Sequence, residues 1–255
     1  MRSIHIDHGN PMNAILDTPF TRALKNLGKS FEKPRRIIIQ SAHSITDGET
    51  IEIENHPHPQ MIYDMYGFPP ELYTVQYPVH TDIEWSRSLW EIFTGSWIHN
   101  TFNSHRGIDH GIWSVLIHLF PEADIPIIPI SVPYNLPAQY HFHVGESLAE
   151  NFDDETLFIS SGNIVHNLRM IDWNKWVTPN WARDFDHSIE EICQSDTYSS
   201  IIDYQKLPWS DLAVPTPDHF FPFITFMGAS MGKNMESLYQ GFDMGSISTR
   251  VYQSF

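Results

Sequence analysis

Residues 157–169, with the sequence LFISSGNIVHNLR, decide how the rest of this chain is interpreted. Three apolar residues at 157–159 predict a buried strand, the small residues at 160–162 predict a tight turn, and a helix is expected to follow with His166 in its first turns. A histidine just beyond the carboxyl end of a core strand lies where open α/β sheets place their chemistry. Taken alone, a histidine at a helix start more often caps or hydrogen-bonds than reacts, so the interpretation of His166 depends on the other histidines.

The segments on both sides of this stretch alternate between strand and helix patterns. Strands are predicted at residues 4–7, 35–40 and 246–254, and the prolines within residues 124–132 predict an edge or irregular strand there. Helical periodicity appears after Thr18-Pro19, with a stop at Gly28, and then at residues 84–102, 112–119 and 138–152, around Trp181, and after Thr216-Pro217. We therefore expect one α/β domain spanning residues 1–255, with a central mostly parallel or mixed sheet flanked by helices.

Composition excludes several classes of partner. The 255 residues include 31 Asp and Glu but only 15 Lys and Arg, so the net charge of -16 would repel nucleic acid and acidic lipid. No apolar run approaches the length of a membrane span, and Cys193 has no second cysteine to pair with. These features predict a soluble cytoplasmic protein that binds neither nucleic acid nor membrane.

Four histidines follow predicted strands or begin a predicted helix, and we expect them to converge on one metal ion at the carboxyl-end rim of the sheet. They are His8, His43, His166 and His219. Neutral imidazole is a good ligand for Fe(II) and Zn(II), and a catalytic site needs about three protein ligands. The spacing lacks the compactness of a zinc finger and is a weak signal alone. Phosphate-binding and nucleophile-elbow motifs are absent, and Ser160 and Ser161 suit a turn better than a nucleophile.

Six segments in order resemble the class III extradiol ring-cleavage dioxygenases, and more narrowly the DOPA 4,5-dioxygenase branch of the LigB-like superfamily. They span almost the whole chain: HGNPMNAI (8–15), IIIQSAH (37–43), GIDHGIWSVLIHLFPEADIPIIPISV (107–132), YNLPAQYHFHVGESL (134–148), LFISSGNIVHNLR (157–169) and PTPDHFFPF (215–223).

The resemblance implies a role for each histidine. His8, His43 and His219 match metal ligands, and His166 matches an active-site histidine that acts as acid and base or as a fourth ligand. His110, in GIDHG, matches a histidine that helps to bind substrate or oxygen. The catalytic residues are thus His166 and His110. The third ligand position carries a histidine, where many non-haem Fe(II) oxygenases use a carboxylate.

The function implied by the resemblance is a metal-dependent extradiol dioxygenase that opens the ring of a catechol such as DOPA with O2. Fe(II) is expected for activity, Zn(II) is possible in a purified sample, and no organic cofactor is needed. A monomer or small homo-oligomer is expected, and residues 44–80 and 133–145 are candidates for specificity. The alternatives are a zinc-bound non-redox enzyme and a non-catalytic metal-binding protein on the same fold.

Overall fold

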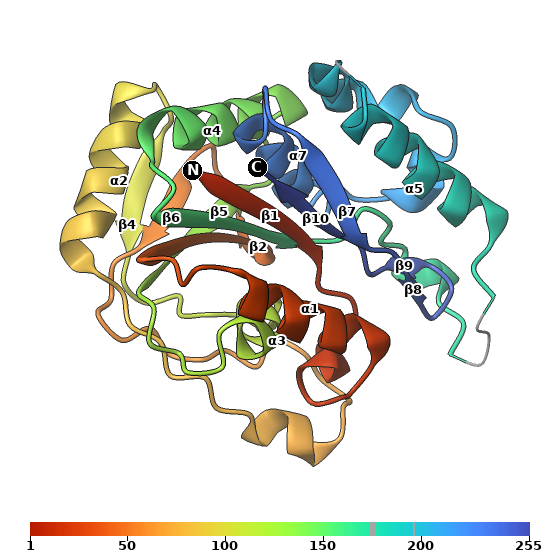
Figure 1. The fold of residues 1–255 in the computed structure, drawn as a ribbon, viewed down its shortest axis with the longest axis horizontal. Helices are drawn as coiled ribbons and strands as arrows, with labels where there is room; N and C mark the ends of the chain where they lie inside the picture. Colours follow the sequence, from red (N-terminus) through yellow and green to blue (C-terminus); the bar gives the residue numbers. More distant parts are fainter. Residues whose placement is uncertain (174–176, 196) are drawn as a thin grey trace.

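One mixed eight-stranded sheet forms the centre of the molecule in a computed structural model, which describes residues 1–173, 177–195 and 197–255 (Figure 1). The strand order is β4-β3-β5-β2-β6-β1-β10-β7. The strands are β1 (Arg2–Asp7), β2 (Arg36–Thr46), β3 (Ile51–Glu54), β4 (Asn100–Asn103), β5 (Ile127–Pro133), β6 (Thr156–Gly162), β7 (Met235–Tyr239) and β10 (Val251–Ser254). A small second sheet pairs β8 (Phe242–Asp243) with β9 (Ile247–Ser248).

The four central strands β5, β2, β6 and β1 are parallel, so their carboxyl ends meet at one rim of the sheet. In the register, Asp7 of β1 lies opposite Gly162 of β6, and Ser161 of β6 lies opposite Ser41 of β2. His8 follows Asp7 and His43 follows Ser41 by two residues, so the register brings both histidines to the same rim.

Helices cover both faces of the sheet (Figure 1). On one face, α1 (Pro19–Ser30) and α3 (His110–Leu119) pack over alternate residues such as Ile37 and Ile39. On the other face, α2 (Ile83–Gly95), α4 (Ala138–Asn151), α5 (Asn180–Cys193) and α7 (Phe221–Ala229) pack over residues such as Ile38 and Phe158. Shorter helical segments are η1 (Pro11–Ala14), η2 (Pro70–Thr74), η3 (Leu168–Met170), η4 (Tyr198–Lys206) and α6 (Ser210–Ala213).

The expected α/β class with a mixed sheet flanked by helices is confirmed. At the start of α1, Thr18 caps the helix as predicted, because its hydroxyl accepts a hydrogen bond from the Thr21 amide at 3.1 Å. The predicted stop at Gly28 is wrong, since α1 continues to Ser30. Gly28 instead permits close contact with α3, because a Cβ atom there would lie 2.0 Å from the carbonyl oxygen of Leu119.

The predicted turn at residues 160–162 and the helix carrying His166 are also wrong. Strand β6 continues through Ser160 and Ser161 to Gly162, because these small residues pair with both β1 and β2. The following segment bends and lies against other parts of the chain. The Ile164 amide donates to the Asp7 carboxylate, and His166 forms an isolated β-bridge with Ile247.

Strand β5 is not at an edge, since it lies between β3 and β2. The amide of Ile127 donates to the carbonyl of His80, away from β2. Backbone N–H directions alternate along a strand, so the nitrogen of Pro129 points to the same side as that of Ile127, away from β2. The N–H that Pro129 lacks therefore removes no hydrogen bond to β2.

Other boundaries also differ from those predicted. The helix predicted at 84–102 ends at Gly95, and β4 occupies 100–103. Strand β2 extends past His43, and the strand predicted at 246–254 divides into β9 and β10. Helix α7 begins at Phe221, so Thr216 is not its cap and Pro222 lies in its first turn. The periodicity also missed β7.

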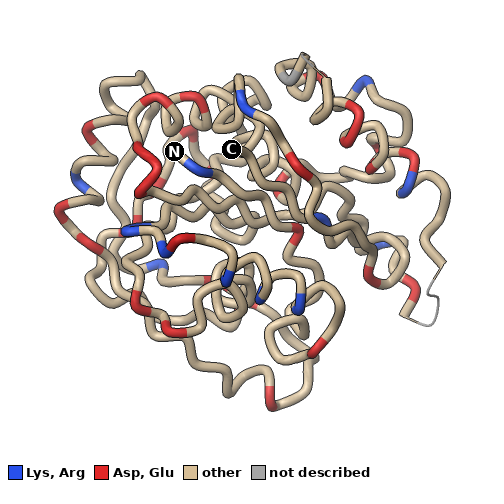
Figure 2. The backbone as a smooth tube through the Cα atoms, viewed as in Figure 1, with Lys and Arg blue, Asp and Glu red and all other residues tan. Residues whose placement is uncertain are grey.

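Acidic residues are distributed around the surface of the molecule (Figure 2). The negative charge is therefore spread along the chain and is not concentrated in one acidic segment. Among the helices of the described residues, none combines the length and apolar character needed to cross a bilayer.

We predict that Gly145→Ala destabilises the protein by about 1–3 kcal/mol or more. A Cβ atom at Gly145, in α4, would lie 2.0 Å from the carbonyl oxygen of Thr225 in α7, so the two helices would have to separate. Urea unfolding measures the effect. Gly95→Ala is the matched control, because no atom lies within 4 Å of its added Cβ, and its stability should change by less than about 1 kcal/mol. Equal stability of the two variants would contradict the close helix contact.

Candidate metal centre

Three histidines from distant parts of the chain meet at the rim of the sheet. His8 follows β1, His43 lies in β2, and His219 lies in the turn before α7. The Nε2 atom of His43 lies 3.2 Å from Nε2 of His8 and 3.3 Å from Nε2 of His219. His8 and His219 are buried, while His43 is partly exposed to a cavity of about 720 Å³ that all three residues line.

Oxygen atoms hold the opposite side of each ring. Nδ1 of His43 lies 3.2 Å from Oδ2 of Asp64, and Nδ1 of His219 contacts the Asp218 carboxylate. A carboxylate can only accept, so the proton of each neutral ring belongs on Nδ1.

His8 also carries its proton on Nδ1, but the partner of this nitrogen is a hydroxyl group. Its Nδ1 lies 3.0 Å from the Ser161 hydroxyl, which itself donates to the carbonyl of Gly111 at 2.6 Å. Because that donation uses the hydroxyl proton, Ser161 accepts from Nδ1–H of His8.

When each neutral ring carries its proton on Nδ1, the Nε2 lone pair of His43 faces those of His8 and His219. Burial, followed by the charges of neighbouring histidines, lowers the pKa of His8 and of His219 well below 6.5, so neither of these two rings takes up a second proton at neutral pH. Two imidazole ligands at a metal–nitrogen distance of about 2.1 Å are about 3.0–3.4 Å apart, depending on the coordination angle. The observed spacing and ligand chemistry fit a divalent transition metal.

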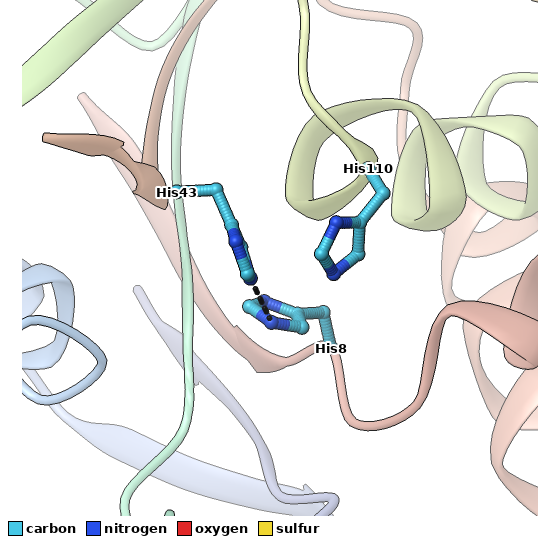
Figure 3. Close-up of side chains that lie close together, drawn as sticks. All are labelled: His8, His43 and His110. Carbon is cyan, nitrogen blue, oxygen red and sulfur yellow. Dashed lines mark hydrogen bonds between the residues drawn. The ribbon is translucent and has the colours of Figure 1, made fainter. Parts of the chain in front are cut away.

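His110, at the start of α3, lies beside His8 and His43 (Figure 3). It shares the Asp64 carboxylate with His43. Its Nδ1 lies 3.0 Å from Oδ2 of Asp64, and its backbone amide donates to Oδ1 at 2.9 Å. Burial opposes ionisation of Asp64, but hydrogen bonds from His110 and His43 outweigh it and hold the pKa of this carboxyl well below its usual range. Burial and His43 in turn lower the pKa of His110.

His166 lies parallel to His219, with ring centroids 3.5 Å apart and an angle of 7° between the rings. Its backbone amide donates to Ala213, but its ring makes no hydrogen bond to the described part of the chain. Burial lowers its pKa from 6.5 to about 4, so the ring is neutral at pH 7. The four histidines predicted to converge, together with His110, thus all line one cavity.

The family model for the catalytic LigB subunit of aromatic ring-opening dioxygenase matches residues 4–252. The chain belongs to the LigB family. A 4,5-DOPA dioxygenase extradiol of Escherichia coli K12 is 33% identical over 257 residues, covering 97% of this chain and 92% of that protein. The corresponding enzyme of Beta vulgaris is 33% identical over 256 residues, with 97% and 94% covered.

The fold of the chain is shared with a solved structure. The crystal structure of an uncharacterized protein from Escherichia coli K12 superposes with a TM-score of 0.86 and 29% sequence identity, covering 99% of each chain. The resemblance to class III extradiol dioxygenases is therefore confirmed, and this LigB protein is an enzyme, an aromatic ring-opening dioxygenase.

Among the described residues, two groups of side chains have the spacing to hold a metal ion. One contains His8, His43 and His110, and the other contains His166, Asp218 and His219. His43 connects them through its Nε2 contact with His219.

Sequence reasoning missed the oxygen partners of the ligand histidines, above all Asp64. This residue lies in the irregular segment 44–80, and residues 64–69 line the cavity. An acidic residue within the aromatic run YDMYGF was the available signal. By contrast, none of the described lining residues comes from 133–145.

We predict that Asp64→Asn weakens metal binding by about tenfold to a hundredfold. The amide removes the negative charge that faces Nδ1 of His43 and His110. Competition with a chromophoric chelator measures the affinity. Asp17→Asn is the control, because this exposed carboxylate pairs with Arg22 on the surface. Unchanged affinity in Asp64→Asn would show that Asp64 does not orient a ligand.

Proposed function

We propose that this enzyme is a non-haem Fe(II)-dependent extradiol dioxygenase that opens the ring of a catechol such as DOPA with O2. The observation that carries the proposal is the convergence of three Nε2 lone pairs at a cavity shared with His110 and His166. Membership of the LigB family and the printed names of the 4,5-DOPA dioxygenase relatives support the same reaction class.

His8, His43 and His219 would hold the metal. A bound Fe(II) would supply Lewis acidity toward the catechol oxygens and the redox chemistry that O2 requires. We assign His166 a role in proton transfer instead of coordination. An imidazole binds a metal ion that lies near the plane of its ring. The rings of His166 and His219 are parallel with centroids 3.5 Å apart, so one ion cannot lie in both ring planes.

His110 is the proposed general base for a catechol hydroxyl. Asp64 holds its Nδ1 proton, which leaves Nε2 as the acceptor, and the lowered pKa keeps that nitrogen unprotonated at neutral pH. Asp64 also stabilises the imidazolium that forms when His110 accepts the proton.

His166 is the proposed acid that returns a proton during ring opening. Its pKa of about 4 makes the protonated ring a strong donor once it has received a proton from the substrate. Its ring hydrogen bonds are not committed to the described protein atoms, so both nitrogens can serve substrate.

We also propose that residues 1–255 form one LigB domain that acts in the cytoplasm as a monomer or small homo-oligomer. One sheet joins both ends of the chain through the pairing of β1 with β10. The free thiol of Cys193 is buried and agrees with a reducing compartment.

Anaerobic reconstitution tests the proposed reaction. Separate samples are loaded with Fe(II) or Zn(II) and mixed with L-DOPA and unsubstituted catechol, and then O2 uptake and a visible ring-opened product are followed. We expect O2 uptake that is stoichiometric with the catechol in the Fe(II)-loaded sample and not in the Zn(II)-loaded sample. Turnover of neither catechol at full Fe(II) occupancy would overturn the proposal, while a non-redox activity with Zn(II) would support the zinc-enzyme alternative.

We predict that His166→Ala lowers kcat by about 10²–10⁴-fold while leaving metal affinity within a few-fold of wild type. His187→Ala is the control, because His187 is an exposed histidine on α5. A large loss of metal affinity in His166→Ala would instead identify His166 as a ligand.

The His166→Ala variant should also differ from the wild-type protein in how its stability depends on pH. The unfolded His166 binds a proton below its pKa of 6.5, whereas the folded ring does so only near 4. The wild-type metal-free protein should therefore lose stability as the pH falls from about 6.5 toward 4, and His166→Ala should lose less. Urea unfolding at pH 7 and pH 5 measures the difference.

A further inference from the structure

The cavity beside the histidines is larger than a single aromatic ring requires. Its volume of about 720 Å³ falls within the range of about 300–1,000 Å³ typical of pockets for drug-sized ligands. A catechol bound at the histidines therefore leaves room for a substantial substituent.

Apolar side chains form much of the remaining wall. They come from four separate segments, which are η1, residues 64–69, residues 168–173, and the turn between β8 and β9. These side chains are Met12, Phe68, Leu168, Ile171, Trp173 and Met244. Several wall residues are also strongly exposed, with Tyr66 at 91%, Trp173 at 69% and Leu168 at 63% of their full accessible surface. Exposed apolar groups gathered around one cavity are typical of a binding surface.

Charge in the wall is unfavourable to an ionic substituent. Among the described residues that line the cavity, none is Lys or Arg, so none of these residues offers a carboxylate a cationic partner. Asp64 is an acidic residue of this wall, and His110 and His43 already share its carboxylate. An ammonium or carboxylate placed against these apolar side chains would lose hydration and find no oppositely charged partner among them.

We propose that this enzyme prefers catechols with a bulky, uncharged apolar substituent over catechols with an amino-acid or carboxylate side chain. The inference rests on the proposed function, since it places the catechol ring at the histidines. Segments 168–173 and 64–69 provide the selectivity by packing against the substituent.

Two pairs of probes separate charge from size. In the first, 4-(3-methylbutyl)catechol replaces the carboxylate of 3-(3,4-dihydroxyphenyl)propanoate with a similar branched group, and in the second, 4-propylcatechol replaces the ammonium of dopamine with a methyl group. Anaerobic calorimetry with Fe(II)-loaded enzyme gives Kd, and oxygen uptake gives kcat/KM. We expect at least about tenfold tighter binding of each neutral member, with L-DOPA among the weaker ligands.

A charge introduced at the wall tests whether this cavity causes the preference. Leu168→Lys should shift the ratio of the two Kd values in the first pair by about tenfold in favour of the carboxylate. Leu16→Lys is the matched control, because Leu16 is exposed, does not line the cavity, and acquires the same charge. An equal shift in both variants would overturn the assignment to this wall.

The outcomes distinguish this inference from the proposed function. Turnover of L-DOPA, dopamine or the propanoate with kcat/KM equal to or above that of the neutral partners would overturn the inference and leave the dioxygenase activity established. Tighter binding of the neutral catechols without oxygen uptake would support the inference and contradict the proposed reaction.

Discussion

The close approach of the His8 and His219 Nε2 atoms to Nε2 of His43 is the constraint on which the site depends. The Nε2 lone pair of His43 faces those of His8 and His219 at 3.2 and 3.3 Å because Ser161, Asp64 and Asp218 hold the opposite nitrogens of the three rings. Without a cation, such an arrangement is electrostatically unfavourable in a buried site. The fold must therefore hold the rings in place by other interactions.

The buried polar network behind the rim supplies part of that support. The Asp7 carboxylate, fully buried beside His8, contacts Nε2 of His5 at 2.7 Å and accepts the Ile164 amide at 2.9 Å and the Arg250 amide at 3.2 Å. These bonds join the end of β1 to the segment that carries His166 and to the start of β10. A buried carboxylate with several partners is costly to disrupt, so the network resists displacement of the ligands.

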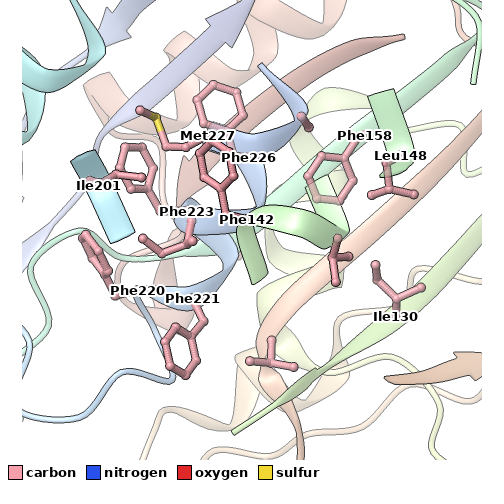
Figure 4. Packing of buried hydrophobic residues seen from close by; sticks show 14 of the residues in the cluster. Ile130, Phe142, Leu148, Phe158, Ile201, Phe220, Phe221, Phe223, Phe226 and Met227 are labelled. Atoms are coloured by element: carbon pink, nitrogen blue, oxygen red, sulfur yellow. The ribbon is translucent and has the colours of Figure 1, made fainter. Parts of the chain in front are cut away.

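Apolar packing fixes the third ligand. Aromatic side chains of α7 and of the residue before it pack against α4 and the sheet (Figure 4). Phe223 and Phe226 also lie against the ring of His5. A Cβ atom at Gly162 would lie 2.3 Å from the carbonyl oxygen of His219, so this glycine lets the turn before α7 approach the end of β6. The position of His219 thus follows from packing across the sheet and not from its own local sequence.

The sequence by itself determined the α/β class, most of the helices, and the six segments that identify the LigB family, because hydrophobic periodicity and residue spacing are local properties. It also indicated which histidines to examine. It did not determine that residues 160–162 continue β6, or that β5 lies inside the sheet, since strand pairing joins residues that are distant in the chain. Only the tertiary structure placed Asp64 between His43 and His110 and stacked His166 on His219. The orientation of each ring depends on partners contributed by other strands and loops, and no local pattern specifies those partners.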